Sequence, residues 1–195
     1  MERIGKILRH PQRVSLVIVL LLYSQQLFSV PHTPLIQNGQ ALNLYIERYQ
    51  NVKIANPLLI VTLREIAFSY NVPSSIAIAV ALYESQLQAD CLNYNKNGTK
   101  DIGLYQLNSE YIPYFLWKLQ YPFPKTFNPY NPVHSASIGI GYLAYLYKQF
   151  ETWELALMAY NGGPTRVKSG NISIVLQKYA STVLYLANCI NAQIF

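Results

Sequence analysis

A mainly α-helical fold is predicted by three features of the sequence. Apolar residues recur at the three-to-four spacing of helices from Pro57 onward. The segments between these runs are short and rich in Asn, Gly or Pro. Outside the central loops, no stretch alternates over the length of a strand. With 51% hydrophobic and 12% charged residues, the 195-residue chain has the composition of a globular protein with one ordinary core.

The apolar spacing also places the individual elements. A helix is expected from Pro57 and ends before Pro73, which breaks it, and Ser74 or Ser75 is expected to cap the next helix. Further helices are expected within residues 134–150, 153–160 and 171–190. A short hairpin or loop region is expected within 93–108, since Asn97-Gly98 is a strong turn signal.

The first 29 residues have the order of an export signal. Four basic residues precede the uncharged run at 14–23, and Ser29 follows as a small residue suited to cleavage. The run is short for a membrane span, which needs about 20 apolar residues. A cleaved signal is therefore favoured over an N-terminal membrane anchor or a buried helix, and we expect export to the periplasm or cell envelope. Residues 30–56 form a lead-in to a domain at 57–195.

The charge of the remaining chain argues against nucleic acid as a partner. Four basic residues and one acidic residue lie within 1–29, so the rest carries a formal charge of +3 instead of +6. Its Lys and Arg residues are scattered and form no nucleic-acid motif. A mildly positive body suits an anionic polymer.

Two cysteines leave two alternatives open. Cys91 and Cys189 could pair in an oxidising compartment, or both could be buried free thiols. Their spacing matches neither a metal site nor a redox pair, and the sequence predicts no metal and no cofactor.

One acidic residue, Glu84, stands at the end of an uncharged run. On a helix it shares a stripe with Ala77, Val80 and Ala81, and the opposite face is equally apolar. Loss of water and the negative end of the helix dipole would both raise the pKa of its carboxyl group. A general acid that works near neutral pH needs this property, although a glutamate at a helix rim with a structural partner is the alternative.

Cleavage of a glycosidic bond is a reaction that such an acid often serves, and it usually needs a second carboxylate. Asp101 is the nearest candidate in sequence, but it could simply bond the turn beside Gly103.

Three ordered segments carry a family resemblance. They are "ALYESQL" with Glu84-Ser85, "GLYQLN" at 103–108 and "ALMAYNGGPTRV" at 156–167. Together they resemble the lytic transglycosylases of the soluble-lytic-transglycosylase, goose-type-lysozyme-like family, over roughly residues 58–185. The segment at 93–108 further resembles small members associated with secretion or conjugation machinery.

This resemblance implies a lysozyme-like α fold with a substrate groove, with 57–195 as the catalytic domain. The substrate would be the β-1,4 bond between N-acetylmuramic acid and N-acetylglucosamine in peptidoglycan glycan strands. One glutamate in this family protonates the leaving oxygen and then deprotonates the muramyl C6 hydroxyl, which closes a 1,6-anhydro ring without water. A second acid is then unnecessary. An envelope-spanning secretion or motility apparatus is implied as a partner.

The family motifs assign roles by position. Glu84 would be the acid and base, Gln106 would line the groove, and Tyr160 and Asn161 would face the glutamate and the sugar acetamido groups. Ser85 is placed among the substrate-binding residues and would fix the helix end. Tyr105, also predicted to contact substrate, stands where the family usually has Met.

Residue 135 and the segment "NYNKNGTKD" each depart from a known pattern. Ser135 occupies a place where the family commonly has Asn, so one loop tie is expected to be shortened or lost. "NYNKNGTKD" has the early spacing of a calcium loop, but Leu104 replaces the twelfth-position Glu, so an Asn-rich turn is favoured. Two other functions remain as alternatives: a hydrolytic muramidase, and a catalytically weak cell-wall-binding domain of an envelope assembly.

Overall fold

Helices make up most of the described part of the chain, which comprises residues 57–193 of a computed structural model. The expected signal or anchor at 1–29 and the lead-in at 30–56 lie outside these residues. In chain order the elements are α3 (Pro57–Ser69), α4 (Ser74–Ser85), β1 (Leu92–Tyr94), β2 (Lys100–Ile102), β3 (Leu107–Asn108), α5 (Ile112–Lys118), the 3₁₀ turn η2 (Pro124–Thr126), α6 (Pro132–Phe150), α7 (Trp153–Gly162), α8 (Pro164–Lys168) and α9 (Ile174–Gln193). The predicted mainly α fold is confirmed. Within 57–193, no helix combines the length and apolar character that a bilayer span requires.

Helix α4 is the most deeply buried element near the predicted site. Every residue from Ser75 to Ala81 is buried, as expected for a helix that is apolar on both faces. The predicted serine cap is wrong, because the helix begins at Ser74 with Pro73 as the N-cap and no side-chain cap. The Pro73 carbonyl instead accepts the first helical bond, from Ala77 N at 3.0 Å.

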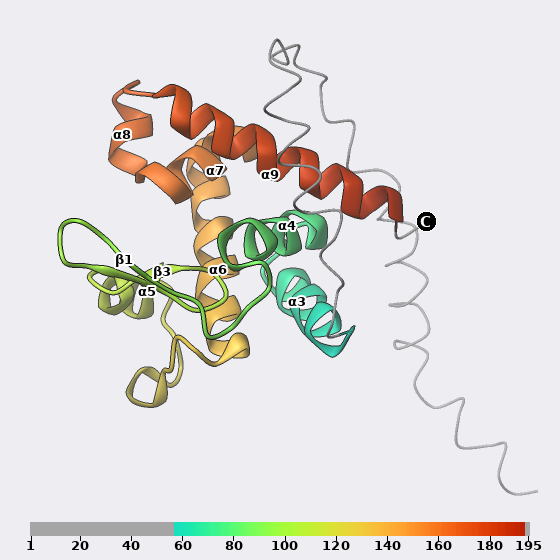
Figure 1. The fold of residues 1–195 in the computed structure, drawn as a ribbon, viewed down its shortest axis with the longest axis vertical. Helices are drawn as coiled ribbons and strands as arrows, with labels where there is room; N and C mark the ends of the chain where they lie inside the picture. Colours follow the sequence, from blue (N-terminus) through green and yellow to red (C-terminus); the bar gives the residue numbers. More distant parts are fainter. Residues whose placement is uncertain (1–56, 194–195) are drawn as a thin grey trace, which may run out of the picture. The chain divides into compact units, whose positions relative to one another are not determined.

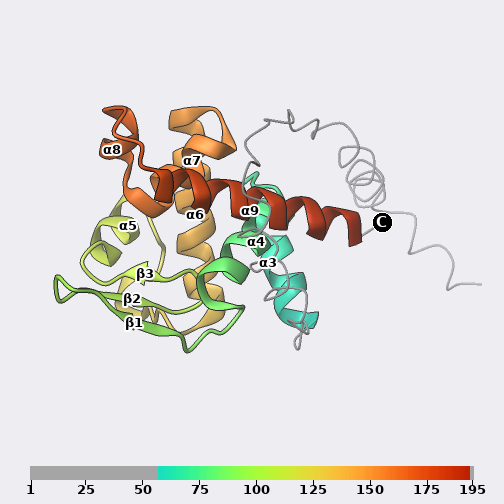
Figure 2. The ribbon, with the colours of Figure 1, turned by 45° about the horizontal axis from the view of Figure 1, so that its top comes forward.

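The C-terminal helix α9 holds the helical part together. It packs extensively on both α4 and α7, and α7 in turn packs on α6. Figure 1 shows α9 lying across α4 and α7, and Figure 2 shows the same crossing from another side, with α6 behind it. The apolar stripe of α9 that faces this core includes Leu176, Ala180 and Val183.

The predicted hairpin is present and has a third strand. β1 and β2 pair antiparallel with Asn93 opposite Asp101, and β2 pairs antiparallel with β3. Gly98 in the connecting turn has φ of +85°, a conformation that glycine adopts without strain. The two-residue strand β3 is too short for the alternation of side chains to reveal it in the sequence.

Two helices were not predicted from the sequence. Both α5 and α8 carry Pro at their N-terminal end, where the fixed φ of proline suits the first helical turn. Proline and glycine in these segments read as loop signals. One buried residue anchors each of them, Phe115 in α5 and Val167 in α8.

The loop at 103–106 approaches two other segments very closely. A Cβ atom at Gly103, which has φ of +77°, would lie 2.0 Å from the carbonyl oxygen of Pro129. A Cβ atom at Gly139 of α6 would lie 2.3 Å from the ring of Tyr105. Glycine at both positions lets the backbone come this close.

Candidate active site

Glu84 lies in the last turn of α4, where the chain leaves the core. Gln86 ends the helix in the left-handed conformation, with φ of +55°, and its N–H bonds the carbonyl of Leu82. The Glu84 side chain is only partly accessible to solvent. The helix therefore brings one carboxyl group to the edge of an otherwise apolar segment.

The surroundings of Glu84 favour its protonated form. Burial raises the pKa of its carboxyl group from 4.5 to about 7, and the charge of Asp101 adds to the rise, while the hydrogen bond from Tyr179 opposes it. The predicted direction of the pKa shift is confirmed. A group with this pKa still holds its proton in a large fraction of molecules near neutral pH.

Tyr179 of α9 is the direct partner of Glu84, and the sequence reasoning missed it. Its hydroxyl donates a hydrogen bond of 2.6 Å to Oε1 of Glu84. The Tyr179 ring is buried and meets the Tyr83 ring edge-on, with centroids 4.9 Å apart. Burial and the nearby Glu84 charge raise the pKa of Tyr179 well above 10, so the hydroxyl remains a donor. In the sequence, the signal that Tyr179 faces the core was its place in the apolar stripe of the helix expected within 171–190.

The second oxygen of Glu84 is left open. Among the described residues, none donates a hydrogen bond to Oε2 of Glu84. The only buried side-chain polar atom of these residues that lacks a hydrogen-bond partner is Nε2 of Gln149, so Oε2 is not among the buried ones. Oε2 is therefore the oxygen that can reach a ligand.

Ser85 ties the end of α4 to the loop at 103–106. Its hydroxyl lies 2.8 Å from the carbonyl oxygen of Leu104 and 3.0 Å from that of Ala81. The residue is buried, with 4% of its surface exposed. The structure thus supports its expected role at the helix end and contradicts its placement among the substrate-binding residues.

Tyr105 is fully buried and offers no surface to a ligand. Its hydroxyl donates a 2.8 Å hydrogen bond to the carbonyl of Ala77 in α4, and its ring packs on Gly139. The prediction that Tyr105 contacts substrate is therefore wrong. A ring can replace Met here because glycine at 139 leaves space for it.

Tyr160 and Asn161 lie at the end of α7 in different environments. The Tyr160 hydroxyl donates a 2.9 Å hydrogen bond to the carbonyl of Tyr105. Burial raises the pKa of Tyr160 well above 10, and the charge of Glu84 adds to the rise. Asn161 is exposed at the surface, with no hydrogen bond from its side chain within the described residues.

Gln106 is held by its own loop. Its Nε2 donates to the carbonyl of Gly103 at 2.8 Å and to that of Cys91 at 3.3 Å, while its Oε1 accepts from Asn93 at 2.6 Å. Its backbone has a positive φ of +46°. The side chain is fixed in place and keeps one free acceptor position on Oε1.

The loop tie at Ser135, which was expected to be shortened or lost, is present. The buried Ser135 hydroxyl accepts a hydrogen bond from the backbone N–H of Tyr105 at 3.2 Å. The short side chain reaches because the α6 backbone comes so close to this loop. Together with Ser85 and Tyr160, Ser135 fixes the loop from three helices.

The central acidic and amide side chains bond one another. Oδ1 of Asp101 accepts a 2.8 Å hydrogen bond from Asn108 in the next strand. The side chains of Asn95 and Asn97 both bond Thr99, as in an Asn-rich turn. Within 57–193, His, Cys, Asp and Glu side chains form no group that could hold a metal ion.

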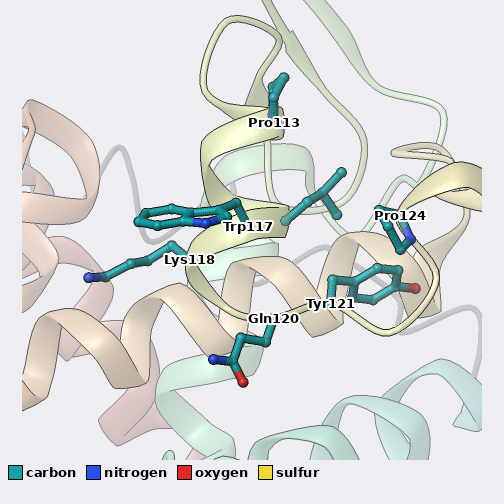
Figure 3. Close-up of a pocket in the computed structure, with 7 residues that line it drawn as sticks. Pro113, Trp117, Lys118, Gln120, Tyr121 and Pro124 are labelled. Carbon is teal, nitrogen blue, oxygen red and sulfur yellow. The ribbon is translucent and has the colours of Figure 1, made fainter.

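The structure also shows a surface hollow of about 780 Å³ beside α5, lined by Pro113, Leu116, Trp117, Lys118, Gln120, Tyr121 and Pro124 (Figure 3). None of the predicted site residues lines this hollow. Cys91 and Cys189 are free, half-buried thiols.

Comparison with known proteins identifies the family. The model of the transglycosylase SLT domain matches residues 62–173, more than half of the chain. These residues include the three motifs around Glu84, Gln106 and Tyr160, and they end before α9. A search of curated proteins found no match.

Three solved structures share the fold. The lytic transglycosylase Slt from Pseudomonas aeruginosa is 23% identical, with a TM-score of 0.59 over 69% of this chain and 24% of the other. The 70-kDa soluble lytic transglycosylase from Escherichia coli is 24% identical, with a TM-score of 0.53 over 64% of this chain and 23% of the other. A complex of the 70-kDa soluble lytic transglycosylase with bulgecin A is 21% identical, with a TM-score of 0.62 over 78% of this chain and 26% of the other.

The chain thus spans about a quarter of the length of these proteins. At such identities the likeness bears on the fold, and the predicted lysozyme-like helical fold is confirmed. Family membership rests on the domain model and on the order of the three motifs. The chain belongs to the transglycosylase SLT domain family.

Proposed function

We propose that this chain is an exported peptidoglycan lytic transglycosylase with Glu84 as its single acid and base. It would cleave the β-1,4 bond between N-acetylmuramic acid and N-acetylglucosamine and release a 1,6-anhydromuramyl product. The observation that carries the proposal is the environment of Glu84: a carboxyl group with a pKa of about 7, held through one oxygen by Tyr179.

The two oxygens of Glu84 suggest how the proton moves. Because Tyr179 donates to Oε1, Oε2 can carry the proton to the glycosidic oxygen as the C1–O4 bond breaks. The resulting carboxylate then takes the proton of the muramyl C6 hydroxyl while O6 bonds to C1. Atoms balance without water, and the glutamate ends protonated as it began.

Tyr179 and the other candidate residues would assist this reaction. The Tyr179 hydroxyl would stabilise the carboxylate between the two proton transfers, because its own raised pKa keeps it a donor. Gln106 would accept a substrate N–H on its free Oε1 position, and Asn161 would bind an acetamido group at the surface. Tyr160 would form the ring surface between them.

Hydrolysis is the second candidate, and one observation favours it. The charge of Asp101 raises the pKa of Glu84, so the two carboxyl groups interact. Asp101 could then activate a water molecule for attack on C1. Its oxygen Oδ1 is occupied by Asn108, which leaves Oδ2 for that role.

Mass analysis of fragments from purified peptidoglycan strands tests the proposal. We expect muropeptides with 1,6-anhydro ends from the wild-type chain, and at least a 1,000-fold slower release from Glu84→Gln, since the acid and base are both removed. Reducing ends alone would refute the transglycosylase proposal. If an Asp101→Asn variant also stopped their formation, the products would identify a muramidase.

Binding without any product would indicate the third reading, a cell-wall-binding domain of an envelope assembly. Glu84→Gln provides the matched control, because the amide keeps the shape of the side chain and can still accept from Tyr179. Unaltered turnover in that variant would exclude the role proposed for Glu84.

The proposed location is based on residues 1–29, and the proposed assembly partner is based on the family resemblance of the segment at 93–108. We propose export to the periplasm or cell envelope, with either a cleaved signal or an N-terminal anchor. An envelope-spanning secretion or motility apparatus is proposed as a partner that needs a local opening in the wall. Comparing the mass of the secreted protein with that of the full chain separates cleavage from anchoring.

A further inference from the structure

A continuous row of aromatic rings leads from the candidate site to α5. The ring of Tyr160, near the end of α7, lies 5.9 Å from that of Tyr142 in α6, measured between centroids. Tyr142 lies 4.5 Å from Phe115 in α5, and Phe115 lies 5.9 Å from Tyr114. The row ends at Trp117, 6.1 Å from Tyr114. Three helices therefore contribute to one aromatic layer.

The outer end of this row is exposed. The fractions of surface accessible to solvent are 53% for Tyr111, 41% for Tyr114 and 72% for Trp117. These residues are spaced three apart and follow one side of α5. We call them the aromatic face. Adjacent exposed rings on a small protein are a common mark of a binding surface.

A cation accompanies the aromatic face. Nζ of Lys118 lies 4.8 Å from the ring centroid of Tyr145 and 5.9 Å from that of Trp117. Figure 3 shows the side chains of Trp117 and Lys118 extending from α5 next to each other. In the part of the chain that the structure describes, no carboxylate forms an ion pair with Lys118, and Glu110 is the nearest acidic residue in sequence. The ammonium group is thus available to an anion.

We infer that the aromatic face and Lys118 bind a section of the glycan strand that lies away from the bond being cleaved. The inference rests on the proposed function and extends it to a second contact with the same substrate. A pyranose ring has an apolar C–H surface that packs on an exposed aromatic ring while its hydroxyl groups stay in water. N-acetylmuramic acid units and their peptides carry carboxylates that Lys118 can bind.

Two observations favour this occupant over a protein partner. The face is linked to Tyr160 through the buried rings of Phe115 and Tyr142, so it lies within a few ring contacts of Tyr160 and a strand several disaccharides long can reach both regions. The face also combines flat, exposed rings with a cation, which suits a sugar that carries a carboxylate. Association with another protein, including a second copy of this chain, is an outcome that the test distinguishes.

Strand binding by the full chain in the Glu84→Gln background tests the inference, because that background prevents turnover. We expect Trp117→Ala to weaken the binding of peptidoglycan strands several disaccharides long about tenfold, measured by calorimetry. Binding of a single disaccharide unit should change less than about twofold. Trp117→Phe, which keeps a ring, should retain most of the affinity.

The matched control is Phe68→Ala. Phe68 is a ring on α3 with 57% of its surface exposed, and it takes no part in the row. We expect no change in strand affinity for this variant. A second measurement concerns Lys118→Gln. This variant should bind peptidoglycan strands more weakly, but its affinity for uncharged N-acetylglucosamine oligomers of equal length should not change.

Two results would overturn the inference. The first is a Trp117→Ala variant that binds long strands as tightly as its parent. The second is a wild-type dimer that dissociates in Trp117→Ala, which would assign the face to a second copy. Failure of the proposed function gives a different result, since wild-type protein would form no anhydro product while Trp117-dependent strand binding persisted.

Discussion

Tyr179 holds Glu84 through a hydrogen bond of 2.6 Å between its hydroxyl group and Oε1 of the glutamate. The bond joins the last turn of α4 to the buried side of α9. It is the one interaction that opposes the rise in the pKa of Glu84, while burial and the charge of Asp101 promote it. The pH range in which Glu84 can act as an acid therefore depends on Tyr179.

The first prediction concerns Tyr179→Phe. Loss of the hydroxyl should raise the pKa of Glu84 further above 7, so the fall in kcat/KM at alkaline pH should move to higher pH. Rates of strand cleavage between pH 5 and 9 measure the shift, expected to be about one pH unit. Tyr185→Phe on the same helix is the control, because that hydroxyl bonds Cys189 instead. An unshifted profile in Tyr179→Phe would contradict the assignment.

The second prediction concerns stability and pH. Glu84 loses its proton above about pH 4.5 in the unfolded chain and above about 7 in the folded chain, so its contribution to stability falls as pH rises between these values. Glu84→Gln does not titrate. Relative to wild type, we expect the free energy of unfolding of the variant to be roughly 2–3 kcal/mol more favourable to the folded state at pH 8 than at pH 4. Urea unfolding at both values measures this change, and equal pH dependence of the two proteins would refute it.

The third prediction concerns Ser85→Ala. The substitution removes the hydroxyl that bonds the carbonyl of Leu104 and leaves that buried oxygen without this donor. We expect a loss of about 1–3 kcal/mol in unfolding free energy. Ser181→Ala, which removes an exposed hydroxyl bonded within α9, should cost less than about 0.5 kcal/mol. Denaturant titration of both variants is the measurement, and equal losses would argue against a tie at the end of α4.

The fourth prediction compares two glycines of α6. A methyl group at Gly139 would lie 2.3 Å from the Tyr105 ring and 2.6 Å from its Cβ, whereas a methyl at Gly141 would find its nearest atom at 3.1 Å. We expect Gly139→Ala to destabilise by about 1–3 kcal/mol and Gly141→Ala to remain within about 1 kcal/mol of wild type.

Tyr105→Met provides a further check on this contact. It should not rescue Gly139→Ala, because any side chain at 105 keeps the Cβ atom that lies 2.6 Å away. Thermal melts of the single and double variants decide this, and full rescue would show that the ring alone makes the contact.

Local patterns in the sequence were enough to predict much of the fold. Apolar spacing located α3, α4, α6, α7 and α9, because each buries a long stripe against the core. The turn at Asn97-Gly98 located the hairpin. The short helices α5 and α8 were missed because their proline residues, favourable at a helix start, also mark loops.

Glu84 was the one residue of the candidate site that the sequence supported without the family motifs. A lone carboxylate after an apolar run pointed to Glu84 and to a raised pKa. The burial of Tyr105 could not be predicted, because it depends on the absence of a side chain at Gly139, 34 residues away in the sequence. The contact of Tyr179 with Glu84 could not be predicted either, because the two residues lie on different helices.

The separation of Tyr179 from Glu84 has a consequence for how the protein is made. The two residues lie 95 positions apart, and Tyr179 belongs to α9, the last helix of the described residues. During synthesis the segment with Glu84 emerges long before α9, which must pack on α4 and α7 before the hydrogen bond can form. Glu84 thus acquires these surroundings only after α9 has been made, and a product that stops before Ile174 would carry the glutamate without its partner Tyr179.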